Sequence, residues 1–266
     1  MNLSNRSLLW LNSLSFILMI GLNMAGALGW LNGVTVSEVS DQYQTLLTPA
    51  GYAFSIWSLI YLLLIGFLGY QWKSHAEGNA THSLEPAGIW FALANVFNTL
   101  WIVAWVNAWI GLALLLIIGL FICLFQLVLR LRLETWDAPV RIIWFVWWPI
   151  CIYMGWVTLA TALNFASWLK AVFDTPPFFS AEFWAIVALA SLTSIYLLWT
   201  QLRNMREASL VAVWGMVAIA VNQWQVSWIV SSFALAGCVL LLARTAQHVF
   251  SNQASLPHNK LKRGEF

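Results

Sequence analysis

Charged residues are scarce in this chain. Only 8% of its 266 residues are Asp, Glu, Lys or Arg, whereas 61% are hydrophobic. A soluble domain carries about 25% charged residues, so this composition argues against a water-soluble globule and favours a protein embedded in a lipid bilayer. The net charge is only +2, and no run of Lys and Arg lies beside aromatic residues. We therefore expect the bilayer, and no nucleic acid, as a partner.

Cysteine is also rare, and the usual catalytic motifs are missing. The three cysteines, Cys123, Cys151 and Cys238, lack C-x-x-C spacing, which argues against a disulfide framework and against a zinc site. The motifs H-E-x-x-H and G-x-S-x-G, phosphate-binding glycine loops and paired catalytic carboxylates are absent too. An enzyme therefore ranks below the non-enzymatic hypotheses, and no cofactor is required.

Long apolar runs, in contrast, are abundant. A helix that crosses a bilayer needs about 20 mostly apolar residues. Eight such runs are present, at 8–31, 52–72, 87–107, 109–130, 142–168, 182–202, 209–225 and 227–248. The sequence predicts an all-α fold, a polytopic membrane helix bundle of about eight transmembrane helices. A cleaved signal peptide ending near Ala25-Gly26-Ala27 is the less favoured alternative for the first run, because that run is about as long as a full span.

The basic residues indicate an orientation. With eight spans, eleven of the 12 Lys and Arg residues fall on the side of the N-terminus, and Lys170 alone falls on the other side. Because Lys and Arg collect on the cytoplasmic side, both ends are predicted to be cytoplasmic, in a membrane of the bacterial inner (plasma) type. The basic tail, residues 251–266, is expected to be a disordered, lipid-facing anchor.

No charged side chain lies in the middle of a predicted span. All ten acidic residues fall at or near span ends. Ion-coupled carriers and voltage sensors usually need an intramembrane charge, so this distribution argues against them. A channel or a carrier of neutral solutes stays open.

The polar groups inside the spans are amides and indoles that share helix faces. The chain has 19 Trp, and several recur at intervals of three and four residues with Asn or Tyr. The candidate ligand-binding residues on these faces are Trp57, Tyr61, Asn98, Trp101, Trp105, Trp156 and Asn164. A neutral amide in hydrocarbon needs a hydrogen-bond partner, so these faces should point into the bundle. They either join helix to helix or line an aromatic cavity that suits a flat, largely apolar ligand.

Three sequence blocks carry a family resemblance. Residues 47–61, with Pro49, Phe54, Trp57 and Tyr61, resemble the pattern that opens the second helix in the TspO/MBR family of tryptophan-rich sensory and translocator proteins, although Ala50 replaces the second proline. Residues 97–101 are similar to the family's N-x-x-W in the third helix. Residues 148–164 are similar to its fifth helix, although the tyrosine stands four positions after the proline. The blocks follow the family's order and spacing.

The resemblance covers residues 1–170, a five-helix unit in that family. It implies binding of tetrapyrroles, such as protoporphyrin or haem, and of hydrophobic drugs or sterols, beneath the loop after the first helix. Carried over, Trp57 and Trp156 would flank the pocket, Asn98 and Trp101 would line it, and Asn164 would brace the fifth helix. Porphyrin degradation, attributed to pocket tryptophans in some members, stays open here.

Residues 175–250 add three further runs that the short family members lack. They would complete a larger pocket, form a homodimer contact or dock a partner protein. The leading hypothesis is an integral membrane sensory or ligand-binding protein for a porphyrin, haem or another flat hydrophobic molecule. The alternatives are a transporter for a neutral or lipophilic solute and a membrane scaffold.

Overall fold

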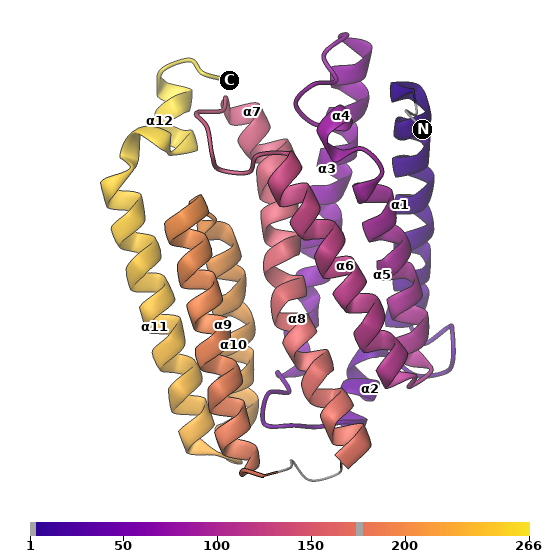
Figure 1. Ribbon diagram of the computed structural model, residues 1–266, viewed down its shortest axis with the longest axis vertical. Coiled ribbons are helices and arrows are strands. Elements are labelled where there is room, and N and C mark those ends of the chain that lie inside the picture. The colour runs from indigo at the N-terminus through magenta and orange to yellow at the C-terminus, as the bar shows by residue number, and fades with distance from the viewer. Residues whose placement is uncertain (1–3, 174–177) are drawn as a thin grey trace.

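The computed structural model describes residues 4–173 and 178–266, and this part of the chain is helical with no strand. The long helices of the described residues are α1 Asn5–Ala27, α3 Ile56–Ala76, α5 Trp90–Val106, α6 Ile110–Arg130, α8 Trp148–Phe173, α9 Ala181–Arg203, α10 Arg206–Gln223 and α11 Trp228–Ser251. They run alternately in opposite directions (Figure 1). The predicted all-α bundle is confirmed, and each long helix coincides with one predicted apolar run.

The chain is an integral, multi-pass membrane protein. Six helical stretches of the described residues are long and apolar enough to cross a bilayer. They contain α1, α3, α6, α8, α9 and α11. α5, at 17 residues, is shorter, and α10 is not among the six.

Local signals in the sequence begin and end several of these helices. Ser4, Ser180 and Ser227 each accept a hydrogen bond from a backbone N–H of the first turn, at the start of α1, α9 and α11, which satisfies a donor that would otherwise lack a partner. Asn204 adopts the left-handed conformation, with φ of 60°, and ends α9 two residues before α10 begins.

Short helices occupy the connections. α2 Val36–Gln42 and the 3-10 helix η1 Gly51–Ser55 lie between α1 and α3, and α4 Leu84–Ala87 precedes α5. α7 Val140–Ile142 and the π-helical turn η2 Ile143–Trp147 lead into α8 without a break. Pro149 has no N–H to donate, and a π turn just before it fits that local loss of the helical ladder.

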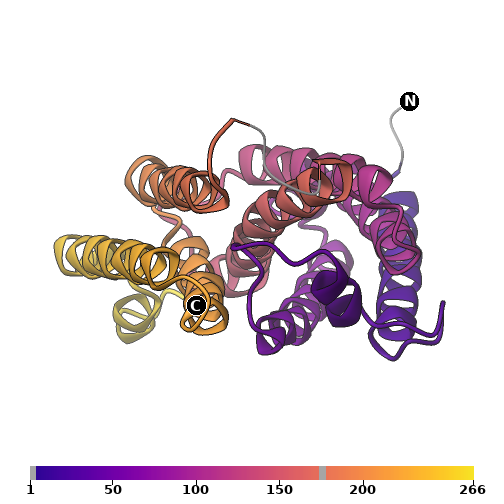
Figure 2. The same cartoon turned by 90° about the horizontal axis from the view of Figure 1, so that it is seen from below.

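Of the three C-terminal long helices, α10 makes most of the packing against α8. α10 contacts α8 on one side and both α9 and α11 on the other, so α8 lies between the first helices and the last three (Figure 2). Small residues allow the close approach. A Cβ at Gly155 of α8 would lie 2.9 Å from Ala208 Cα of α10, and a Cβ at Gly215 of α10 would lie 2.0 Å from Leu159 Cδ2 of α8.

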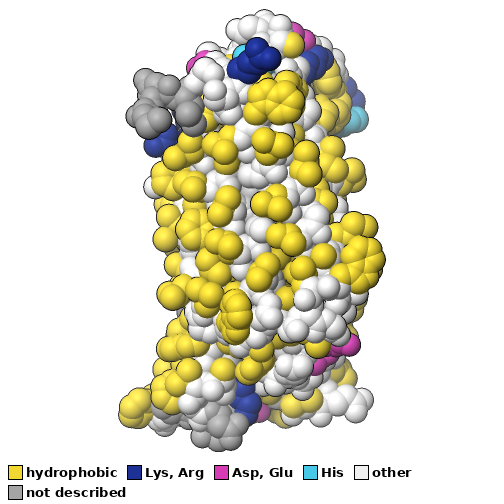
Figure 3. Space-filling view, turned by 90° about the vertical axis from the view of Figure 1, so that its right-hand side faces the viewer, with side chains coloured by type: hydrophobic (Ala, Val, Ile, Leu, Met, Phe, Trp, Pro, Cys, Tyr) yellow, Lys and Arg dark blue, Asp and Glu magenta, His cyan; other side chains and the backbone are white. Residues whose placement is uncertain are grey.

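On the face shown in Figure 3, apolar side chains cover the middle of the molecule and charged side chains gather toward its ends. Because the long helices alternate in direction, the basic residues at the start of α1 and at the ends of α6, α9 and α11 share one end of the bundle with both termini (Figure 1). This is the distribution that eight spans predict.

The C-terminal segment differs from the expected disordered, lipid-facing tail. It forms η3 Gln253–Ser255 and α12 Pro257–Lys262 and folds back onto the bundle. Lys260 is only 1% exposed and donates hydrogen bonds to Asp137 and, at 3.1 Å, to Glu265 Oε2. The Val140 N–H donates to the Glu265 carbonyl at 3.0 Å. These contacts explain the difference, because a buried ammonium held by two carboxylates keeps the segment ordered.

A largely buried carboxyl group lies in the connection between α6 and α7. Glu134 Oε2 accepts a hydrogen bond from Asn204 Nδ2 at 2.9 Å, while Glu134 Oε1 is buried and has no partner among the described residues. Burial, assisted by repulsion from the Glu207 carboxylate, raises the pKa of Glu134 to about 8. The Glu134 carboxyl group therefore holds a proton at neutral pH.

Candidate functional site

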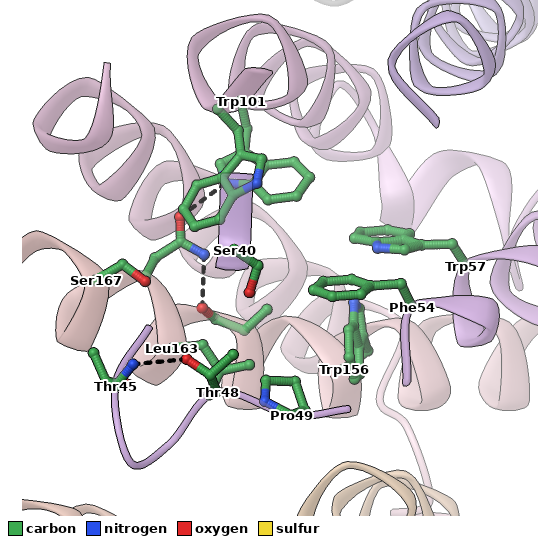
Figure 4. A pocket seen from close by; sticks show the side chains of 13 residues that line it. Ser40, Thr45, Thr48, Pro49, Phe54, Trp57, Trp101, Trp156, Leu163 and Ser167 are labelled. Atoms are coloured by element: carbon green, nitrogen blue, oxygen red, sulfur yellow. Dashed lines mark hydrogen bonds between the residues drawn. The ribbon is translucent and has the colours of Figure 1, made fainter. Parts of the chain in front are cut away.

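Aromatic side chains from three helices surround one pocket, with a connecting segment across its end. Trp57 of α3, Trp101 and Trp105 of α5 and Trp156 of α8 form its walls together with Phe54 (Figure 4). The other lining residues are Ser40, Thr45, Thr48, Pro49, Ala160, Leu163, Asn164 and Ser167. We call this the aromatic pocket. None of these side chains is charged.

Trp57 is the centre of the aromatic cluster. Its ring centroid lies 6.0 Å from that of Trp101 and 6.3 Å from that of Trp156, the latter edge-on at 83°. Phe54 contacts Trp156 at 6.2 Å, again edge-on. Edge-to-face and tilted pairs at these separations stabilise one another beyond their burial, so the cluster is a packed unit.

Hydrogen bonds orient two of the four pocket indoles. Trp101 Nε1 donates to Asn164 Oδ1 at 3.0 Å, and Trp105 Nε1 donates to the Val36 carbonyl at 3.1 Å. Asn164 in turn donates to the Ala160 carbonyl of its own helix at 2.8 Å. Trp156 Nε1 is buried and has no acceptor among the described residues. A buried indole N–H usually has a partner, so this donor is available to an acceptor on a ligand.

Residues 43–55, which we call the cover segment, lie across the pocket at the end away from the termini. Thr45, Thr48, Pro49 and Phe54 of this segment are among the lining residues. The remaining cavity is about 20 Å³, which is room for about one water molecule. The tryptophans and Phe54 therefore fill their own pocket, and a ligand of any size enters only if the cover segment or these rings move.

A comparison with known protein families shows the family of this chain. The family described as TSPO-like protein matches residues 9–246. The chain belongs to this family. The match continues through α9, α10 and α11, whereas the last of the three short sequence blocks ends at residue 164. Neither the curated proteins nor the solved structures contain a match to the chain.

In this TSPO-like chain, the structure brings together five of the seven candidate site residues. These are Trp57, Trp101, Trp105, Trp156 and Asn164, which line the aromatic pocket. Tyr61 does not line it but stacks on Trp57 at 5.6 Å, one helical turn deeper.

Asn98 also lies outside the lining, in a hydrogen-bonded chain that joins three helices. Asn23 Nδ2 of α1 donates to Asn98 Oδ1 at 2.6 Å, and Asn98 Nδ2 of α5 donates to the Tyr153 hydroxyl of α8 at 2.9 Å. Asn98 is fully buried. Its amide holds the helices that carry the pocket tryptophans.

Asn98→Leu is expected to lower the stability of this TSPO-like protein by roughly 1–2 kcal/mol, because it removes the buried hydrogen bonds that join Asn98 to Asn23 and to Tyr153. Thermal unfolding in detergent, followed by circular dichroism, measures the loss. The matched control is Asn107→Leu, since the Asn107 amide bonds only to the Val103 carbonyl of its own helix. An equal loss in both variants would contradict the role of the interhelical chain.

The sequence blocks contained pocket residues that were not chosen as candidates. Phe54 and Pro49 lie in the block that resembles the second helix, and both line the pocket. The family pattern was the signal that could have identified them. Ser40 and Thr45 had no such signal, because their connection to the site depends on the path of the cover segment.

Proposed function

We propose that this protein binds a flat hydrophobic molecule in the aromatic pocket, with a tetrapyrrole such as protoporphyrin or haem as the first candidate. The observation that carries the proposal is the meeting of four tryptophans and Phe54 from separate elements around an uncharged pocket. Flat indole walls stack on flat ligands, and a few neutral polar groups suffice to orient them.

The unpartnered Trp156 Nε1 supports the same proposal. A hydrogen-bond donor with no acceptor in a buried apolar site costs free energy that a ligand acceptor would recover. A porphyrin propionate or a ligand carbonyl could accept this bond.

We further infer that the end of the bundle with the termini faces the cytoplasm, in a bacterial-type inner membrane. The gathering of basic side chains at that end supports this orientation. The aromatic pocket and the cover segment then face the opposite side of the membrane.

Titration with protoporphyrin tests the proposal. The purified protein in detergent is expected to show saturable quenching of tryptophan fluorescence. Trp57→Phe and Trp156→Phe are each expected to weaken binding about tenfold, since each removes stacking area and the latter also removes the free donor. Phe is chosen because Ala would add a cavity to a packed cluster.

The matched control is Trp228→Phe, because Trp228 is 72% exposed at the start of α11 and distant in sequence from the pocket elements. This variant should bind as the wild type does. Quenching that does not saturate, or affinities that are the same in all four proteins, would overturn the proposal.

A further inference from the structure

α10 donates hydrogen bonds from three side chains to the backbone of the cover segment. Trp214 Nε1 donates to the Ala53 carbonyl at 3.1 Å, and Asn222 Nδ2 donates to the Thr48 carbonyl at 3.0 Å. Gln223 Nε2 donates to the same Thr48 carbonyl at 3.3 Å. These pairs are more than 150 residues apart in the sequence, so they join the last helices to the connection between the first two.

The cover segment also donates one bond in return. The Ala50 N–H donates to the Ala218 carbonyl of α10 at 3.0 Å. The family pattern has proline at this position, and proline has no N–H. The alanine that departs from the pattern therefore supplies a donor that this contact uses.

Packing accompanies these bonds. The Tyr52 and Trp214 rings meet edge-on at 5.2 Å. Ala53 is fully buried and Thr48 is 5% exposed. α10 therefore holds the stretch 48–53 at both ends, next to the pocket residues Pro49 and Phe54.

Because the pocket is closed, the contacts between α10 and the cover segment affect how a ligand can enter. The cavity of about 20 Å³ does not admit a flat ligand while Phe54 and its neighbours stay in place. The stretch that must move is the one that α10 holds. Asn222 and Gln223 need bonding partners near the membrane, and their partners are carbonyls of this stretch.

We propose that α10 is a latch on the cover segment, so that a ligand reaches the aromatic pocket only after the bonds from Trp214, Asn222 and Ala50 break. The C-terminal helices then control ligand access, in addition to packing on α8. The part of this proposal that concerns the ligand rests on the proposed function, whereas the part that concerns the segment does not.

The first experiment needs no ligand. Amide hydrogen exchange of peptides within residues 43–55 is compared in the full-length wild type and in Trp214→Phe/Asn222→Leu, which keeps an aromatic ring and a similar volume but removes two donors. Exchange in the cover segment is expected to rise about tenfold. The control is Trp224→Phe, since Trp224 follows α10 and is 61% exposed; its exchange should match the wild type.

A second variant keeps the test decisive if Trp214→Phe/Asn222→Leu fails to fold. Ala50→Pro removes only the backbone donor, and the Ala50 φ of −59° is one that proline adopts. Exchange of the remaining segment amides is expected to rise, with the helices unchanged. Unchanged exchange in both variants, or an equal rise in all helices, would overturn the latch.

The second experiment measures access. Mixing with protoporphyrin in a stopped-flow instrument, followed by its visible absorption, is expected to show association several-fold faster in Trp214→Phe/Asn222→Leu than in the wild type and the Trp224→Phe control. Faster exchange with an unchanged association rate would overturn the control of access. If the wild type binds no protoporphyrin, the proposed function falls, while the exchange result still decides the latch.

Discussion

Gly155→Val is expected to lower the stability of the folded chain by about 1–3 kcal/mol or more, because it forces α8 and α10 apart. A Cβ at this position would lie 2.9 Å from Ala208 Cα and 3.2 Å from the Ala208 carbonyl oxygen. Backbone atoms cannot rotate out of the way as a side chain can, so one of the two helices has to shift.

The same substitution is expected to disturb the contacts that α8 makes with the last helices. The Tyr196 hydroxyl of α9 donates to the Gly155 carbonyl at 2.7 Å, and a displaced helix would weaken this buried bond. Thermal unfolding in detergent measures the stability, and hydrogen exchange locates the change.

Gly21→Val is the matched control. Gly21 also lies inside a long helix, α1, but a Cβ there would meet no atom within 4 Å. Its effect should be limited to the small difference in helix propensity. A loss as large in Gly21→Val as in Gly155→Val would show that the substitution acts through propensity and that close packing of α8 on α10 is not required.

The stability of the wild type is expected to fall as the pH rises from about 5 to 8. Glu134 has a pKa of about 8 in the folded chain, against an ordinary value of 4.5. Between these two values the folded chain keeps a proton that the unfolded chain releases, so rising pH favours unfolding. Above about pH 8 the carboxyl group is ionised in both states, and its contribution no longer changes.

Glu134→Gln is expected to weaken this dependence and to stabilise the chain above pH 8, because the neutral amide cannot ionise where the carboxyl group would. The neutral amide keeps an oxygen that can accept the bond from Asn204 Nδ2. Melting temperatures at pH 5 and pH 8.5 measure the effect, with Glu77→Gln as the control, since the Glu77 side chain is 54% exposed on the surface near Lys73. A melting temperature for Glu134→Gln that falls with pH as steeply as that of the wild type would contradict the assignment.

The helices of this protein could be predicted from its sequence because a bilayer imposes their length and composition. The inward direction of the amides followed from the cost of an unpaired amide in hydrocarbon, and the burial of Asn98 and Asn164 confirms it. The contact partners of these inward-facing amides could not be predicted from the sequence. The structure places Asn164 beside Trp101 in the pocket and Asn98 between Asn23 and Tyr153.

Contacts between distant segments could not be predicted from the sequence either, because no local pattern indicates the partner of a polar side chain. Asn222 and Gln223 lie near the end of the predicted run 209–225, and nothing local indicates that their partner is Thr48. Lys260 was likewise expected in a disordered basic tail, because nothing in the sequence indicates that it lies beside Asp137. The spacing of apolar residues indicates which face of a helix is apolar, but the hydrogen-bond partner of a polar side chain depends on the path of the whole chain.

The position of α10 also bears on how the protein enters the membrane. α10 carries polar residues at both ends, Arg206 and Glu207 at its start and Asn222 and Gln223 at its end, and most of its residues are buried against α8, α9, α11 and the cover segment. Such polar side chains are costly to place in lipid without partners. During synthesis α10 is therefore expected to enter the bilayer together with its neighbours, so the closing of the pocket comes late in assembly, after the last helices have been made.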